Sequence, residues 1–231
     1  MARLAIAFGL AKNGELVKTL GPKSVITGAL GAIGLALFLS AAAAPPRQQS
    51  TATPATETVL TLDANQSKVH WTVDTTLHTV HGTFNLRDGT LHFDPQTGKA
   101  GGEIVVLASS GESGNDSRDA RMHKEILETA KFPDAVFRPT LIEGVVAPSG
   151  PSDIKLHGIF SIHGADHDLV VPVHADLNDG HWKGTGKFHV PYTDWGIKDP
   201  SNFFLKVKHV VVVELDFSGE TKPPKPHPSL Q

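Results

Sequence analysis

Short runs of alternating apolar and polar residues fill the chain between residues 57 and 220. In the run 68–74, Val69, Trp71 and Val73 alternate with polar neighbours. Alternation of this kind puts apolar side chains on one face of a β-strand and polar ones on the other. Gly, Pro, Asn and Asp separate the runs at intervals of about ten residues, which predicts an antiparallel all-β domain of about eight or more strands. The pattern by itself leaves a barrel and a sandwich both open.

The expected strands cover residues 68–74, 82–94, 103–109, 135–146, 154–164, 167–177, 181–191 and 203–219. Within one of these runs, Asp88-Gly89 predicts a tight hairpin turn, because this dipeptide readily adopts the backbone angles of such a turn. Apolar residues on the runs supply the expected interior, and some of them must fill a core rather than contact a ligand. These residues are Trp71, Val73, Phe84, Phe93, Phe137, Ile142, Phe160, Ile162, Phe188 and Phe203.

One stretch breaks the β pattern, since residues 116–130 have the spacing of a helix. Asp116 or Ser117 is a suitable N-cap, because its side chain can accept a hydrogen bond from a free N–H group of the first turn. An apolar stripe at helical spacing needs a surface to rest on, and the outside or the open end of a barrel provides one. The stripe consists of Met122, Ile126, Leu127 and Ala130. Pro133 prevents the helix from continuing.

The start of the predicted helix is rich in charges, and we interpret these charges as structural. Asp116 and Asp119 lie three residues apart, where carboxylates cap a helix start and interact favourably with its dipole. Arg118 is expected to form a local ion pair with Asp119. This interpretation assigns no catalytic role to the cluster.

The two ends of the chain differ in composition from the domain. Residues 1–44 combine scattered Lys and Arg, a long uncharged run and a small-residue close, which favours a secretory signal peptide cleaved near Ala43. The run is also long enough to be an uncleaved membrane anchor, and a buried core helix is the remaining alternative. Residues 45–56 are expected to be a disordered linker, residues 57–220 the domain and residues 221–231 a Pro-rich tail. With a signal or an anchor, the domain works outside the cytoplasm, in the periplasm or an equivalent location.

Composition and missing motifs exclude several classes of function. The 231 residues carry a net charge of −3, which gives no electrostatic reason to expect binding to nucleic acid. The chain has no cysteine, which excludes disulfides, thiolate zinc sites and Cys nucleophiles. It contains neither a Gly-rich nucleotide-binding motif nor a Gly-x-Ser-x-Gly nucleophile motif. We therefore expect neither a cofactor nor enzymatic activity.

The 13 histidines raise the alternative of a metal site. His157, His163, His167 and His174 fall in one predicted hairpin region, and zinc requires three or four ligands that converge. His157 and His163 share a strand face if the strand is regular, but Gly164 predicts a turn that breaks the alternation. A periplasmic metal-dependent hydrolase that uses His157, His163 and another His is therefore retained as an alternative function.

Four segments carry motifs that follow one another in a characteristic order. Residues 67–95 contain an aromatic strand, a Gly-x-Phe and a Gly turn, and residues 114–140 contain an Asn…Arg-Asp helix followed by a Phe-Pro…Phe strand. An Ile-His-Gly hairpin lies in residues 156–173, and an Asp-Trp-Gly-Ile segment lies in residues 192–200. Together these segments resemble the YceI-like, polyisoprenoid-binding family of lipocalin-like barrels, over about residues 57–218. Each motif is weak alone, whereas all four in order are specific.

The resemblance implies an all-β fold, an extended antiparallel eight-stranded lipocalin-like barrel with one inserted α-helix at about residues 116–130. In that family an internal tunnel holds a long isoprenoid, quinone-like or fatty chain without covalent chemistry. The residues that the resemblance and the apolar runs place toward such a ligand are Trp71, Val73, Phe84, Phe137, Phe160, Ile162 and Trp195. Many members carry an Arg just before the Asp-(Phe or Trp)-Gly-Ile segment, where this chain has Tyr192. If that Arg contacts the ligand, a different head group is expected here.

The resulting expectation is an exported lipid-binding protein that sequesters or transports an amphipathic long-chain lipid or isoprenoid in the cell envelope. The membrane is the expected source of the lipid, and a homodimer is left open. Besides the metal-dependent hydrolase, a ligand-free structural or stress-response envelope protein is an alternative.

Overall fold

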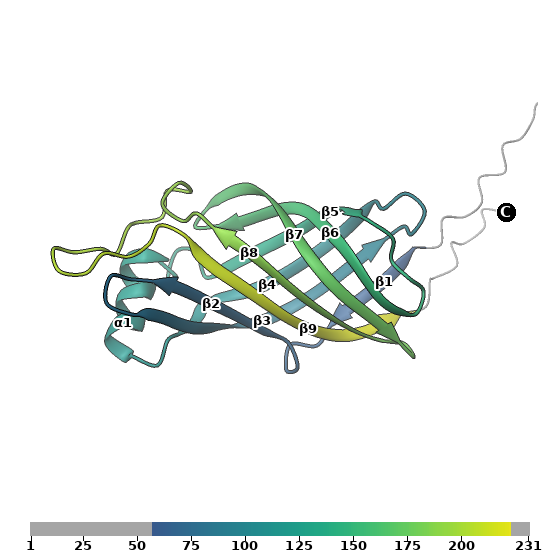
Figure 1. The fold of residues 1–231 in the computed structure, drawn as a ribbon, viewed down its shortest axis with the longest axis horizontal. Helices are drawn as coiled ribbons and strands as arrows, with labels where there is room; N and C mark the ends of the chain where they lie inside the picture. The colour runs from purple at the N-terminus through teal and green to yellow at the C-terminus, as the bar shows by residue number, and fades with distance from the viewer. Residues whose placement is uncertain (1–56, 223–231) are drawn as a thin grey trace, which may run out of the picture. The chain divides into compact units, whose positions relative to one another are not determined.

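The alternating runs form a β-barrel that closes on itself in the computed structural model, which describes residues 57–222 (Figure 1). All strand pairs are antiparallel, and each strand from β2 to β9 follows its neighbour in the chain. The strands are β1 Thr58–Leu62, β2 Lys68–Asp74, β3 Thr79–Phe93, β4 Ala100–Glu112, β5 Asp134–Glu143, β6 Gly150–Ile162, β7 Ala165–Asn178, β8 His181–Val190 and β9 Val211–Lys222.

The first two strands occupy one position in the barrel. Both β1 and β2 pair with β3 on one side and with β9 on the other, so they are two halves of one interrupted strand. A turn at Asp63 separates them: its carboxylate accepts a hydrogen bond from the Asn65 N–H at 2.8 Å, and its own N–H donates to the Ser218 carbonyl at 2.8 Å. The nine strands therefore fill eight positions, and the expected eight-stranded barrel is confirmed.

The predicted hairpin at Asp88-Gly89 is wrong. β3 runs through this dipeptide without turning, and its register with β4 shifts between Leu86 and Asp88. The shift is a β-bulge, in which one extra residue lets the strand keep the same face inward on both sides. Leu86 is buried before the bulge, and Leu91 and Phe93 are buried after it. The dipeptide that predicted a turn therefore lies beside a bulge in a continuous strand.

The tight turns lie at two other dipeptides. His163-Gly164 joins β6 to β7, with φ angles of 51° and 79°, and Asp179-Gly180 joins β7 to β8, with φ angles of 49° and 79°. Positive φ at both central residues is the geometry whose twist matches that of paired strands. An Asp-Gly turn is thus present in the barrel, between β7 and β8.

The helical segment begins at Asp116 as predicted but is shorter, and its N-cap lies one residue before the predicted cap. Asn115 is the N-cap, because its side-chain oxygen accepts from the Arg118 N–H at 2.9 Å. α1 Asp116–Arg121 continues as the π-helical segment η1 Met122–Ile126. The helix ends there and not at residue 130, because Glu128 takes a positive φ of 46° and turns the chain toward β5.

The last strand, predicted over residues 203–219, begins later in the chain than predicted. β9 begins at Val211, which pairs with Val190, the last residue of β8. Residues before Val211 have no β8 partner, so residues 203–210 form a loop and Phe203 lies exposed instead of in the core.

The expected signal or anchor (1–44), the linker (45–56) and the tail beyond residue 222 lie outside the described residues. Among residues 57–222, neither helical segment has the length and apolar character needed to cross a membrane.

Deleting Asp88 should test the bulge. Without the extra residue, one half of β3 must turn its apolar side chains to solvent, so we expect the free energy of unfolding to fall by about 3–6 kcal/mol, the burial of two large apolar groups. Deleting Ser149, in the exposed β5–β6 loop, is the control and should have little effect, since loops tolerate changes in length. Urea unfolding followed by circular dichroism measures both, and equal losses would contradict this role of the bulge.

Candidate functional site

The barrel encloses an apolar cavity of about 410 Å³. Every strand contributes inward-facing side chains to it, at alternate positions. Large buried side chains fill the end near the start of β8: Phe93, Leu177, Trp182 and Phe217. The Trp182 indole N–H donates to the Thr61 carbonyl at 3.2 Å, which fixes this packing. That end of the barrel is therefore occupied by protein.

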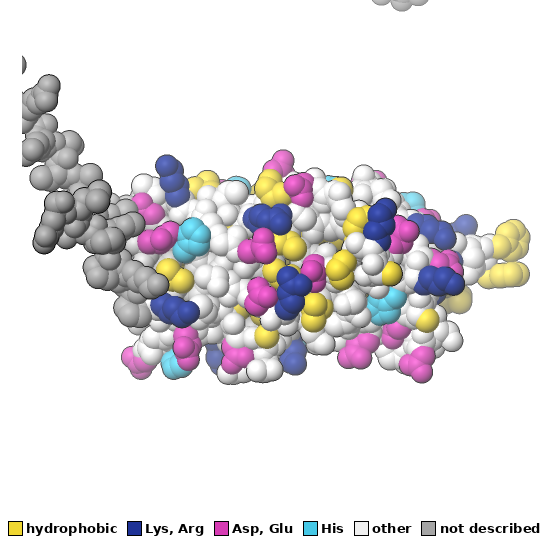
Figure 2. All heavy atoms as spheres, turned by 180° about the vertical axis from the view of Figure 1, so that it is seen from behind, with side chains coloured by type: hydrophobic (Ala, Val, Ile, Leu, Met, Phe, Trp, Pro, Cys, Tyr) yellow, Lys and Arg dark blue, Asp and Glu magenta, His cyan; other side chains and the backbone are white. Residues whose placement is uncertain are grey.

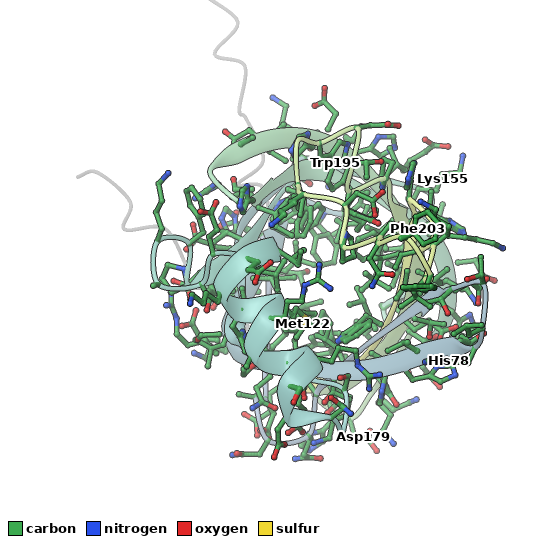
Figure 3. The ribbon with its side chains drawn as sticks, turned by 90° about the vertical axis from the view of Figure 1, so that its left-hand side faces the viewer. His78, Met122, Lys155, Asp179, Trp195 and Phe203 are labelled. Atoms are coloured by element: carbon green, nitrogen blue, oxygen red, sulfur yellow. The ribbon has the colours of Figure 1, made fainter. Side chains whose placement is uncertain are left out.

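The cavity extends to the opposite end of the barrel, where the helix and two loops line it. Met122 and Ile126 come from the helix, His78 from the β2–β3 loop, and Leu205 and Val207 from the loop before β9. Figure 3 looks onto this end and shows the helix with Met122 on one side and the loops carrying His78 and Phe203 on the other. We call this end the mouth.

Six of the seven residues predicted to contact a ligand line the cavity. They are Trp71, Val73, Phe84, Phe137, Phe160 and Ile162. Trp71 and Phe84 come from the paired strands β2 and β3, and their ring centroids are 6.3 Å apart. These side chains share one lumen because the pleat turns alternate residues of every strand inward.

Trp195 is the exception. Its ring stacks on His167 with centroids 4.1 Å apart and packs against Phe160 at 5.9 Å, and it does not line the cavity. The segment after β8 curls, with the Ile197 N–H donating to the Tyr192 carbonyl at 2.9 Å. The curl brings Tyr192 and Ile197 to the cavity lining, whereas Trp195 packs against the same apolar cluster without lining the cavity.

Several residues that line the lumen were not predicted from the sequence, although the alternation of their strands indicates them. Val171 and Val173 of β7 and Val213 of β9 line the cavity, and each follows from alternation once one inward residue of its strand is known. The apolar stripe of the helix, with Met122 and Ile126, was predicted to rest on the barrel. It lies at the mouth, over the lumen rather than on an outer face.

Charged side chains line the cavity only at the mouth, within the described part of the chain. These are Arg118 and Arg121 of the helix, accompanied by His78. Arg121 is partly exposed and lies 3.5 Å from Glu125. Basic side chains thus line the cavity at the mouth, while the deeper lumen offers almost no polar group.

Tyr192 is the polar residue that stands out in the lining. It is buried and its hydroxyl has no hydrogen-bond partner. Burial, together with the Asp199 carboxylate, raises the pKa of Tyr192 to about 12, so the phenol stays neutral at physiological pH. The indole N–H of Trp71 is likewise buried without a partner. A lumen of this kind accepts an uncharged chain, because burying an unpaired charge is costly.

Arg118 and Asp119 meet through a third residue rather than in the expected direct ion pair. The Arg118 Nε–H donates to the Ser113 hydroxyl at 2.7 Å, and a second guanidinium N–H donates to the Ser113 carbonyl at 2.8 Å. The Ser113 N–H donates to the Asp119 carboxylate at 3.0 Å, and the Ser113 hydroxyl donates to the same carboxylate. This Ser113 clasp ties the helix to the end of β4.

The clasp also affects the pKa of Asp119. Burial acts to raise this pKa, but the hydrogen bonds from Ser113 and the charge of Arg118 outweigh it and hold the pKa below its usual value of 3.8. The carboxylate is therefore charged at neutral pH, as the clasp requires.

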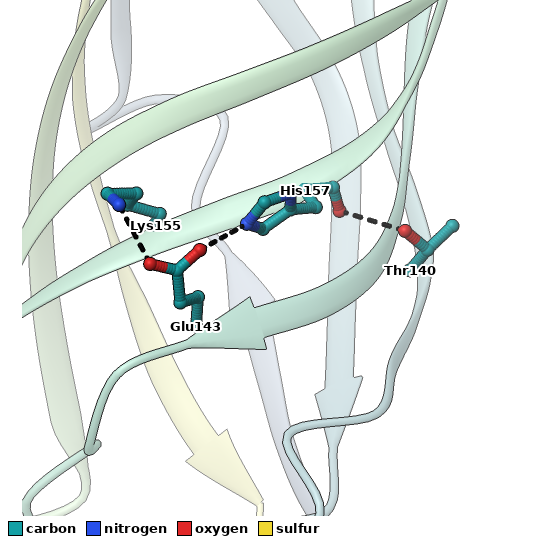
Figure 4. Close-up of polar contacts among 4 residues, drawn as sticks. All are labelled: Thr140, Glu143, Lys155 and His157. Carbon is teal, nitrogen blue, oxygen red and sulfur yellow. Dashed lines mark hydrogen bonds and ion pairs between the residues drawn. The ribbon is translucent and has the colours of Figure 1, made fainter.

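The histidines of the metal-site alternative do not converge. His157 points outward, and the Glu143 carboxylate accepts from its Nε2 at 3.0 Å and from the Lys155 ammonium at 2.7 Å (Figure 4). His163 sits in the β6–β7 turn, 2.9 Å from a carboxylate oxygen of Glu128 but not aligned for a hydrogen bond. Among residues 57–222, no three His, Asp or Glu side chains are placed to hold a metal ion.

Fold and site together define a class of protein: a closed antiparallel barrel of lipocalin-like architecture, with an apolar lumen that is filled at one end and has basic side chains of the helix at the other. Residues 60–219 match the YceI-like domain. The match covers more than half of the chain, so this protein belongs to the YceI-like family. The family predicted from the sequence motifs is thereby confirmed.

Solved structures with the same fold include two bacterial proteins. The chain is similar to Burkholderia cenocepacia BcnA, with 16% identity, a TM-score of 0.56 and coverage of 68% of this chain and 98% of that chain. It is also similar to a polyisoprenoid binding domain from Saccharophagus degradans implicated in plant cell wall breakdown, with 15% identity, a TM-score of 0.55 and coverage of 71% and 98%. At these identities the likeness shows the fold. No curated protein matches the chain.

Replacing Arg118 with alanine should open the clasp. The variant leaves the Ser113 carbonyl and the Asp119 carboxylate without their cationic partner, so we expect the free energy of unfolding to fall by about 1–3 kcal/mol. Lys124→Ala, an exposed position on the same helical segment, is the control and should stay within about 0.5 kcal/mol of the parent. Thermal unfolding of the two variants measures the difference, and an unchanged Arg118→Ala protein would show that the clasp contributes nothing to stability.

Replacing Asp119 with asparagine should destabilise the fold at neutral pH, and this loss of stability should shrink as the pH falls. Because the folded-state pKa is lowered, the carboxylate stabilises the fold at pH values above 3.8 and loses this effect as pH falls through the folded-state pKa. The parent should therefore be more stable than the variant at pH 7, and the gap should close below pH 3.8. Urea unfolding at a series of pH values gives the gap; a gap that widened in acid would have the wrong sign.

Proposed function

We propose that this protein is an exported carrier that holds one long-chain amphipathic lipid, an isoprenoid, quinone-like or fatty molecule, in the barrel lumen. The observation that carries the proposal is the lumen itself: a cavity lined almost entirely by apolar side chains and extending to one end of a closed barrel. Such a lining offers almost no hydrogen-bond partners to a polar ligand, whereas a hydrocarbon chain gains free energy when it leaves water.

Energetics favour a long chain over a short one. Each buried CH₂ contributes about 0.8 kcal/mol, so a longer chain gains more, although its loss of freedom and that of the protein offset part of the gain. The cavity is preformed between strands that are fixed by their hydrogen-bond ladders, which lowers the ordering cost on the protein side. Binding of this kind needs no catalytic group.

The mouth suits the other end of an amphipathic molecule. Arg118 and Arg121 offer guanidinium donors next to the apolar lumen, and such donors bind carboxylate and phosphate oxygens well. Tyr192, buried and neutral at the point where many family members carry an Arg, adds no charge to the wall. We therefore expect the polar head at Arg118 and Arg121, with the chain in the lumen.

Two further considerations support a carrier in the cell envelope. The N-terminal residues 1–44 have the composition of a signal peptide or an anchor, and one protein of the same fold is described as a polyisoprenoid binding domain. Sequestration or transport of a membrane-derived lipid follows from a site that binds without chemistry. The metal-dependent hydrolase has weaker support, because His157 and His163 are engaged by Glu143 and Glu128 on separate parts of the barrel.

Filling the lumen should abolish binding without unfolding the barrel. Val173 faces the cavity and Val170, on the same strand, faces outward. We expect Val173→Trp to lower the uptake of a prenyl phosphate or a long-chain fatty acid at least about tenfold, since the indole occupies the volume of the chain, and Val170→Trp to leave it unchanged. Uptake is measured by native mass spectrometry after organic extraction and reloading, with circular dichroism to confirm that both variants fold.

The same measurement separates the alternatives. A parent protein that neither co-purifies with a lipid nor takes up added isoprenoid or fatty acid would overturn the carrier function in favour of a ligand-free envelope protein. A bound metal at one equivalent, whose removal abolishes a hydrolytic activity, would overturn it in favour of an enzyme.

A further inference from the structure

Three large apolar side chains project from the mouth end of the barrel. Phe203 and Phe204 are 88% and 85% exposed, and Leu77, in the neighbouring β2–β3 loop, is 73% exposed. The two Phe rings pack edge to face, with centroids 5.2 Å apart. In Figure 2 apolar side chains form the extreme right-hand tip of the molecule, with basic side chains behind them. Exposed aromatic groups gathered at one point are a mark of an interaction site.

Hydrogen bonds hold the two loops together as one unit, which we call the tip: residues 75–78 and 201–210. The Thr76 N–H donates to the Lys206 carbonyl at 2.9 Å, and Thr75 forms a β-bridge with Val207. Asn202 accepts from the N–H groups of two residues that follow it, at 2.9 and 2.8 Å. The backbone of the tip is thus fixed in a shape that points the Phe rings outward.

The tip is continuous with the wall of the lumen. Leu205 and Val207 line the cavity, and so do Thr75 and His78 from the other loop. The side chain of Phe204 therefore faces solvent, and that of the next residue, Leu205, faces the lumen. An apolar path from the outside surface to the cavity runs along this loop.

Charge at the tip is complementary to an anionic surface. Lys206 is exposed and makes no ion pair with any residue in 57–222, and Lys208 is exposed although it lies 3.1 Å from Asp74. The Asp199 carboxylate accepts from the Ser201 N–H at 2.8 Å and lies 3.3 Å from the His209 ring nitrogen. Aromatic side chains flanked by lysines are the residues that anchor proteins at the boundary between lipid head groups and acyl chains.

We propose that the tip inserts into the head-group region of a bilayer containing anionic lipid, so that the mouth faces the membrane and lipid passes between bilayer and lumen along Leu205 and Val207. The passage of lipid rests on the proposed carrier function, whereas the docking itself does not. A second copy of the chain is a poor occupant of the tip. Stable protein interfaces bury about 1,200 Å² or more, and two Phe side chains supply only about 150–250 Å² each.

Because the chain has no cysteine, docking can be tested on the full chain with a fluorophore at one position. Leu77→Cys carries an environment-sensitive label at the tip, and Val145→Cys carries it at the other end of the barrel, where Val145 is 83% exposed. With vesicles of phosphatidylglycerol and phosphatidylcholine, brominated acyl chains should quench the label at 77 and leave the label at 145 unquenched. Since each label reports its own depth, contact through residues 1–56 does not imitate the signal at 77.

Replacing both aromatic residues should remove the contact. In the Leu77→Cys background, Phe203→Ser with Phe204→Ser should lower the vesicle affinity reported at 77 at least about tenfold, because two buried rings are lost. Lys206→Glu should weaken contact with anionic vesicles, and Lys183→Glu, on β8 near the other end, should not. Equal quenching at 77 and 145, no quenching at 77, or a signal that survives loss of both Phe residues would overturn the proposal. So would a signal at 77 that depends on protein concentration and not on vesicles, which would indicate a second copy.

A separate arm distinguishes this proposal from the carrier function. The Phe203→Ser/Phe204→Ser variant should still take up a fatty acid supplied as a monomer, because its lumen is intact, and Val173→Trp should still dock to vesicles. If the chain with an intact lumen and tip did not take up the monomeric fatty acid, while the label at 77 was still quenched, the carrier function would be wrong and the docking proposal would remain supported.

Discussion

Closure of the sheet is the constraint on which the rest of this structure depends. β9 pairs with both halves of the first strand position, so every described strand has a paired neighbour on each side. A closed sheet has an inner face that must hold either side chains or a ligand. Here Trp182 and its neighbours fill one end, and the helix and loops surround the other. The lumen is what remains between them.

The two ends of the barrel consequently have different roles. At the filled end, large buried side chains provide much of the apolar core. At the mouth, the Ser113 clasp holds the helix to β4, and the tip joins the loop before β9 to the β2–β3 loop. Basic side chains, apolar lining and exposed aromatic rings all occur at this one end. A carrier that exchanges an amphipathic molecule with a membrane requires such a grouping, since head, chain and bilayer must meet at one opening.

Two local features show how the strand pattern was interpreted correctly in kind and wrongly in detail. Asp88-Gly89 predicted a tight turn, but this dipeptide is also compatible with a bulge, and only the pairing with β4 decides between them. Phe203 looked like a strand residue because it is apolar and close to a strongly β-forming run. Its position is decided by the register in which β9 pairs with β8, which no local pattern encodes.

The sequence by itself determined the β class, the approximate strands, the single helical segment and, through four ordered motifs, the family. Those follow from alternation, helical spacing and turn residues, which are local properties of the chain. It also identified six residues of the lumen wall, because alternation fixes which side chains share a face. Only the tertiary structure decided that Trp195 lies outside the cavity lining, that Tyr192 lies within it, and that Arg118 reaches Asp119 through Ser113. Each of these depends on a curl of the chain or on contacts between segments, and the pairing of segments distant in sequence is a property of the closed barrel as a whole.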